Sequence, residues 1–125
     1  MLQHVALTVN DSEEIEKFYE DVLLFRHGDK FSLKDKIASE IFNVTGTTEV
    51  YKMDQMDVQL EIFLSSKKEN KVFSHICLAY PDPEKIYHKA VDRGYKTFVK
   101  KNPVKNTFFI WDQSGNLFEL KYSKL

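Results

Sequence analysis

The sequence has little cysteine, little arginine and no long apolar run, and each shortage narrows what the protein can be. Cys77 is the only cysteine, so the chain cannot form an internal disulfide, which fits a reducing cytoplasm. No apolar run approaches the roughly 20 residues that a membrane-spanning helix needs, so we expect no membrane partner. The net charge of −1 gives no general attraction to nucleic acid. We therefore expect a cytoplasmic protein that binds neither membranes nor nucleic acid.

The length and composition are those of a folded domain. A chain of 125 residues is large enough to bury a core without disulfides or other cross-links. Hydrophobic residues make up 42% of it and aromatic residues 14%, which excludes a disordered chain. The sequence therefore predicts a single domain over residues 1–125.

The most informative feature that is present is an internal repeat. The segment HVALTVNDSEEIEKFYEDVLLF from His4 aligns without a gap with HICLAYPDPEKIYHKAVDRGYK from His75. The two segments share His4/His75, Leu7/Leu78, Asp11/Asp82, Glu13/Glu84, Ile15/Ile86 and Asp21/Asp92. Each copy also ends in a strand-like run with a carboxylate inside it, QLEIF around Glu61 and LFELK around Glu119. Two His/Glu pairs, brought together, would make a metal site with four ligands.

Hydrophobic periodicity predicts the same order of elements in both halves, a strand, a helix and three further strands. The expected strands are 3–9, 24–28, 49–53 and 58–64 in the first half, and 75–80, 95–99, 107–112 and 116–122 in the second. The expected helices are 12–23, capped by Asp11, and a second that begins after Asp82 and ends at Gly94. The polar stretch 65–71 is the expected linker, so the modules are 1–64 and 72–125.

The first half contains an insertion near LKDKIASEIFNVTG. Its apolar residues have helical spacing, which predicts a short helix over residues 34–43. An apolar helix at the mouth of a binding site would close it and exclude water, so we expect this helix to act as a lid.

The phase of the strands places the candidate ligands on one face of each sheet. Glu61 and Glu119 lie opposite the apolar residues of their strands, and His75 shares a face with Cys77. All of them point away from the face that packs under a helix, and such a face meets solvent or lines a cavity. Among the strand aromatics, we expect Phe109 and Trp111 to line a substrate pocket, because they share a phase beside the Glu119 strand.

The segments HVALTV with FYEDVLLF, LEIF, SHICLAY and FFIWDQSGNLFELK resemble the vicinal oxygen chelate superfamily. This superfamily includes glyoxalase I, methylmalonyl-CoA epimerase, fosfomycin-resistance thiol transferases and bleomycin-resistance proteins. The resemblance implies an α+β fold in which two tandem βαβββ modules form a curved mixed-sheet cup around one divalent metal. By motif, it implies His4, Glu61, His75 and Glu119 as the metal ligands. These donors suit zinc, nickel, cobalt, iron or manganese, and relatives of this size usually form homodimers.

Among these proteins the chain looks most like glyoxalase I, which implies a metal-dependent lyase or isomerase. The substrate would be a small α-carbonyl compound such as a hemithioacetal, converted through an enediolate after Glu61 or Glu119 takes the α-proton. Arg26 and Arg93 are the only arginines, and no motif for binding the carboxylates of glutathione is found. Two alternatives stay open: a metal-free, bleomycin-resistance-like protein that sequesters a small molecule, and a methylmalonyl-CoA epimerase-like enzyme.

Overall fold

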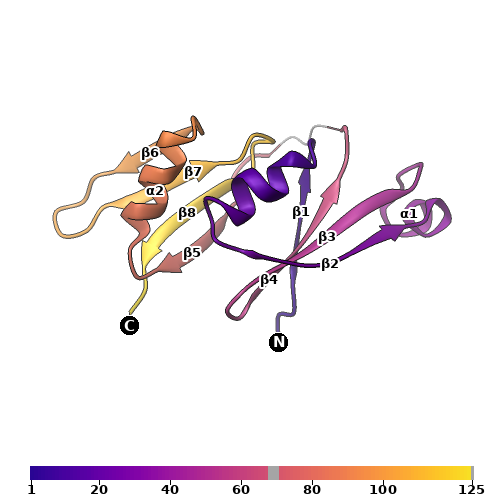
Figure 1. The fold of residues 1–125 in the computed structure, drawn as a ribbon, viewed down its shortest axis with the longest axis horizontal. Helices are drawn as coiled ribbons and strands as arrows, with labels where there is room; N and C mark the ends of the chain where they lie inside the picture. The colour runs from indigo at the N-terminus through magenta and orange to yellow at the C-terminus, as the bar shows by residue number, and fades with distance from the viewer. Residues whose placement is uncertain (68–70, 125) are drawn as a thin grey trace. The chain divides into compact units, whose positions relative to one another are not determined.

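The computed structural model describes residues 1–67 and 71–124, and the chain divides into two compact units. Unit 1 is Met1–Lys68 and unit 2 is Glu69–Leu125. Each contains a four-stranded mixed sheet (Figure 1), and each is described by itself. The expected linker 65–71 lies partly outside the described residues. None of the helices in the described ranges has the length and apolar character needed to cross a membrane.

In unit 1 the strands are ordered β1–β4–β3–β2. The elements are β1 (Val5–Val9), η1 (Ile15–Glu20), β2 (Arg26–Leu33), α1 (Asp35–Phe42), β3 (Thr48–Gln55) and β4 (Val58–Leu64). Strand β1 pairs parallel with β4, whereas β3 pairs antiparallel with both β4 and β2. The inserted helix predicted over 34–43 is therefore present as α1, between β2 and β3 (Figure 1).

Two elements of unit 1 differ from their predictions. The helix expected over 12–23 is a π-helical segment, η1, which buries Ile15, Phe18 and Tyr19. The strand expected over 24–28 is β2, Arg26–Leu33. Its later start has a local cause: Leu24 has a φ of 65°, a left-handed conformation that is incompatible with an extended strand.

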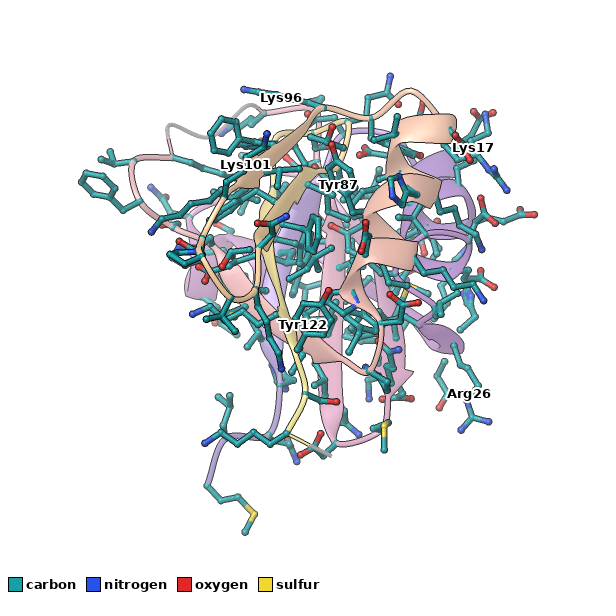
Figure 2. All side chains as sticks on the ribbon, turned by 90° about the vertical axis from the view of Figure 1, so that its left-hand side faces the viewer. Lys17, Arg26, Tyr87, Lys96, Lys101 and Tyr122 are labelled. Carbon is teal, nitrogen blue, oxygen red and sulfur yellow. The ribbon has the colours of Figure 1, made fainter. Side chains whose placement is uncertain are left out.

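In unit 2 the strands are ordered β5–β8–β7–β6. The elements are β5 (Ile76–Tyr80), α2 (Pro83–Asp92), β6 (Thr97–Lys100), β7 (Thr107–Trp111) and β8 (Leu117–Tyr122). The predicted capping of α2 is confirmed: Asp82 accepts a hydrogen bond from the Lys85 backbone N–H at 3.2 Å, and Pro83 begins the helix. On the inner side of α2, the ring of Tyr87 lies 5.1 Å from that of Phe108 (Figure 2).

The turn between β7 and β8 is held by a buried polar network. Asp112 and Asn116 are only 5% and 4% exposed. The Asp112 carboxylate accepts hydrogen bonds from the backbone N–H and from the side-chain amide of Asn116, both at 2.7 Å. Lys71 donates to the amide oxygen of Asn116, and Gly115 supplies the positive φ that the turn requires. This network fixes the β7–β8 hairpin that carries Glu119.

The fold class is α+β, as predicted. Each unit has the expected order of a strand, a helical segment and three strands, with the inserted α1 in unit 1. In each sheet the first strand pairs in parallel with the last strand of its own unit. That pairing brings the first and last residues of the repeated motif together, because the histidine precedes one strand and the glutamate lies in its neighbour.

Candidate metal centre

In unit 1, His4 and Glu61 face each other across two neighbouring strands. His4 directly precedes β1, and Ala6 on β1 is paired with Glu61 on β4. The His4 Nε2 lies 3.5 Å from a carboxylate oxygen of Glu61. Glu61 alternates with Leu60 and Ile62, which are buried on the other face of the sheet. The strand phase predicted from the sequence therefore holds here.

In unit 2, His75 and Glu119 form the equivalent pair. The His75 Nε2 lies 3.2 Å from a carboxylate oxygen of Glu119. The other ring nitrogen, Nδ1, lies 2.8 Å from the backbone carbonyl oxygen of Phe73. A carbonyl oxygen can only accept, so Nδ1 carries the proton and the lone pair of a neutral ring is left on Nε2, the atom that faces Glu119. This backbone contact orients the imidazole as the outer partners of metal-binding histidines do.

The geometry of both pairs fits two donors of one metal ion. Metal–nitrogen and metal–oxygen bonds of about 2.1 Å, at angles between about 90° and 109°, separate two donor atoms by about 3.0–3.4 Å. The separation is 3.2 Å for His75 and Glu119, within this range, and 3.5 Å for His4 and Glu61, just above it. Glu61 and Glu119 are only 18% and 17% exposed, so the carboxylate of each pair is partly shielded from solvent. Two imidazoles and two carboxylates match the donor set expected for a divalent transition metal.

A third His/Glu pair shows that distance alone does not identify such a site. His88 and Glu84 lie four residues apart on α2, with Nε2 3.5 Å from the carboxylate. Their side chains are 63% and 55% exposed, which is typical of a solvated helix-surface pair. The two strand pairs differ from it because the sheet positions their carboxylates and buries most of their surface.

Each unit supplies one pair. In the part of the chain that the structure describes, no three His, Cys, Asp or Glu side chains come together as a group that could hold a metal ion. His4 lies with Glu61 and His75 lies with Glu119, as the repeat predicts. A site with all four ligands therefore requires one pair from each unit, and it stays a prediction.

In unit 1, a lysine and several aromatic residues surround Glu61 on the same face. Lys52 on β3 is the direct cross-strand partner of Glu61, and its ammonium lies 5.6 Å from the ring centre of Phe31 on β2. Phe63 is two residues beyond Glu61, so it shares that face. Phe42, at the end of α1, lies against Phe63 with ring centres 5.6 Å apart. The inserted helix therefore contacts the face that carries Glu61, where a lid is expected.

In unit 2, Lys121 and Cys77 lie next to Glu119. The Lys121 ammonium is 3.4 Å from one carboxylate oxygen, Oε2, while the other, Oε1, faces His75. Cys77 is the cross-strand partner of Glu119. Partial burial of the thiol, followed by the negative charge of Glu119, raises the pKa of Cys77, and the positive charge of Lys121 lowers it. A raised pKa favours the thiol over the thiolate, and the Cys77 side chain is exposed on this face.

Sequence reasoning did not find Lys52 as a neighbour of Glu61. Its placement depends on cross-strand register, and the lengths of the loops between strands do not determine it. A hollow of about 470 Å³ lies along α2 and is lined mainly by charged side chains, among them Glu84 and His88. Because α2 packs against the other face of the sheet, this hollow does not belong to the His75/Glu119 pair.

Comparison with known proteins gives a family and a fold. The model of the Glyoxalase/Bleomycin resistance protein/Dioxygenase superfamily matches residues 1–120. The search of curated proteins finds no match. Among solved structures, a glyoxalase family protein from Enterococcus faecalis aligns with a TM-score of 0.73 and 18% identity, over 96% of this chain and 95% of that chain.

Two further similar structures are fosfomycin resistance proteins. FosX from Mesorhizobium loti aligns with a TM-score of 0.72 and 17% identity, over 100% of this chain and 93% of that chain. A mutant of FosX from Listeria monocytogenes, complexed with Mn(II) and 1S,2S-dihydroxypropylphosphonic acid, aligns with a TM-score of 0.74 and 16% identity, over 100% and 94%. At such identities the likeness concerns the fold.

Proposed function

The chain belongs to the glyoxalase/bleomycin resistance protein/dioxygenase superfamily, and on that premise we propose that it is a metal-dependent lyase or isomerase, most like glyoxalase I. Its substrate would be a small α-carbonyl compound. The observation that carries the proposal is the equivalence of the two His/Glu pairs, each at the junction of the first and last strands of its unit. A protein that only sequesters a ligand has no need of four such donors.

We assign His4, Glu61, His75 and Glu119 as ligands of one divalent ion, with zinc, nickel, cobalt, iron and manganese as candidates. The Mn(II) in a FosX structure of the same fold is consistent with such a site. When bound, the ion would polarise two vicinal oxygens of the substrate and stabilise the enediolate that forms when the α-proton leaves.

The remaining steps belong to side chains of this chain. Glu61 or Glu119 takes the α-proton as general base and returns it to the neighbouring carbon. Lys121 holds the Oε2 atom of Glu119 through their ion pair, which leaves the Oε1 atom facing His75. Phe42 and the apolar side of α1 lie beside the Glu61 face and would exclude water when substrate is bound.

The assembly we propose is a homodimer. The site is then completed either by the two units of one chain or by unit 1 of one chain and unit 2 of its partner. Closed two-fold symmetry is the commonest arrangement of soluble oligomers, and a shared site would give both chains the same environment.

Exchange of the substrate α-proton with solvent deuterium tests the reaction directly. Metal-loaded protein should catalyse exchange on a suitable α-hydroxy ketone or hemithioacetal, and metal-free protein should not. Glu61→Gln or Glu119→Gln should slow exchange by ~10²–10⁴-fold, the usual effect of losing a general base. His88→Gln, in the helix-surface pair, should leave the rate unchanged.

The same samples distinguish the alternatives. The screen should include glutathione and bacillithiol-like adducts, coenzyme A-linked carbonyls and free α-hydroxy carbonyls. Exchange only on coenzyme A-linked substrates would favour an epimerase. Protein that binds no metal and exchanges no proton, yet binds an aromatic ligand tightly, would replace the proposed lyase with a sequestration protein.

A further inference from the structure

We propose that the substrate carries an aromatic group next to a carboxylate, and that this aromatic group lies along a row of side chains that crosses the sheet of unit 2. This inference rests on the proposed function and specifies its substrate class. The row consists of Cys77, Glu119, Phe109 and Phe98, one residue from each strand. It runs from Cys77 on β5, past the carboxylate of Glu119 that we assign to the metal, to Phe98 on the edge strand β6.

The pairing of the strands establishes the row. Cys77 is paired with Glu119, Glu119 with Phe109, and Phe109 with Phe98. Directly paired residues project on the same face of a sheet. One contact on that face agrees with the register: the rings of Phe98 and Phe109 lie 6.4 Å apart. The aromatic pair is therefore continuous with the proposed ligand.

The two phenylalanines are not core residues. The core of unit 2 is on the other face, where Phe108 and Ile110 are 3% and 0% exposed. Phe98 is 57% exposed, and Phe109 is partly exposed. An aromatic side chain left this accessible beside a polar site provides a surface for a flat apolar group.

The spacing of the strands sets the reach of the ligand. Neighbouring strands lie about 4.8 Å apart, so Phe109 is one spacing from the Glu119 strand and Phe98 about 10 Å from it. A molecule with its oxygen atoms at Glu119 and only a methyl group beyond them would leave Phe98 uncovered. A phenyl ring one or two bonds from the oxygens would cover Phe109 and approach Phe98.

Positive charges near the row indicate that the polar end of the ligand is an anion. Lys121 lies beside Glu119, at the polar end of the row. Lys100 is two residues beyond Phe98, on the same exposed face of β6, where its charge would attract an approaching anion. On the next row, the Lys96 ammonium lies 4.4 Å from the ring centre of Trp111. Cations of this kind attract a carboxylate, and the aromatic rings bind the rest of the molecule.

The occupant we infer is therefore an aryl-substituted α-hydroxy or α-keto carboxylate, whose vicinal oxygens would meet the metal. A second copy of the chain is the competing occupant of the same row. The two are distinguished because a small anion needs the lysines and the metal, whereas an apolar interface needs neither.

The test compares three α-hydroxy acids that differ only in the group beyond the chelating oxygens: lactate, mandelate and 3-phenyllactate. Mn(II) binding is measured first, and each acid is then titrated into Mn(II)-loaded protein by calorimetry. Fluorescence of Trp111, the only tryptophan, provides a second signal. We expect mandelate and 3-phenyllactate to bind at least tenfold more tightly than lactate, which corresponds to about 1.4 kcal/mol.

Alanine variants test whether the two phenylalanines cause the preference for the phenyl-bearing acids. Phe98→Ala should remove most of the advantage of 3-phenyllactate and less of that of mandelate, and Phe109→Ala should remove both. Lactate binding should change little in either variant. Val104→Ala is the control, because Val104 is 89% exposed on the loop between β6 and β7 and lies outside the row.

The outcomes separate this inference from the proposed function. If Mn(II) and lactate bind but the phenyl group adds nothing, the inference is wrong and the metal site stands. If Mn(II) does not bind, the proposed function fails, and a comparison of phenylacetate with acetate on metal-free protein decides whether the row still prefers an aryl acid. If Phe98→Ala dissociates a dimer and leaves the preference among the acids unchanged, the row is an interface between copies and the inference is overturned.

Discussion

Replacing His75 with alanine should weaken the binding of a divalent metal by about 10²–10³-fold. His75 is oriented twice, by its Nδ1 contact to the Phe73 carbonyl at 2.8 Å and by the position of Nε2 3.2 Å from Glu119. Binding of a four-ligand zinc site provides about 10–16 kcal/mol, or about 2.5–4 kcal/mol per ligand. At about 1.4 kcal/mol for each factor of ten, losing one ligand gives the stated range.

The assay is competition for Zn(II) against a chromophoric chelator of known affinity, at a fixed pH, because ligand protonation changes the apparent affinity. His88→Ala is the matched control, since His88 faces Glu84 at 3.5 Å but on an exposed helix. It should bind zinc as the parent does. Equal loss in the His75 and His88 variants, or no loss in either, would refute the assignment of the strand pair. Circular dichroism of each variant identifies a loss that comes from unfolding.

Three further predictions address assembly, the thiol and the β7–β8 hairpin. A refolded mixture of His4→Ala and His75→Ala chains should recover about a quarter of the parent's metal sites if each site is shared by two chains of a dimer; no recovery would place the site within one chain. In metal-free protein, Cys77 should be alkylated by iodoacetamide only at a higher pH than a free thiol, because its pKa is raised, and Glu119→Gln should lower the pH midpoint by removing a negative charge; an unchanged midpoint would contradict this. Asn116→Ala should destabilise the protein by about 1–3 kcal/mol in urea, because the buried Asp112 carboxylate loses the side-chain amide donor while the backbone N–H of residue 116 remains; a change within error would contradict that role.

The two His/Glu pairs were predictable because the sequence repeats the same motif. A histidine just before one strand and a glutamate within the neighbouring parallel strand come together when the two strands pair in register. Alternation along β4 and β8 then fixes the face on which Glu61 and Glu119 project. Local capping signals were equally reliable at α2, where Asp82 and Pro83 start the helix as predicted.

Features that depend on register or on local backbone geometry were not predictable in this way. Phe98 becomes a neighbour of Phe109, and Lys52 of Glu61, only through cross-strand pairing that the loops do not reveal. The buried residues of the π-helical segment η1 have the spacing that is also typical of an α-helix, so the sequence pattern did not distinguish the two. The late start of β2 follows from the left-handed backbone at Leu24. Leucine rarely adopts this conformation, so the sequence did not predict it.

Because both His/Glu pairs are assigned to one ion, the stoichiometry of metal binding is the decisive measurement. Metal-free protein titrated with Zn(II) or Mn(II) and analysed for bound metal after desalting should saturate at one ion per chain, since each site uses one His/Glu pair from unit 1 and one from unit 2. The Glu61→Gln and Glu119→Gln variants should both lose tight binding. Two ions per chain would show that the pairs act independently, and no retained ion would show that they are not a metal site; either result would contradict the account.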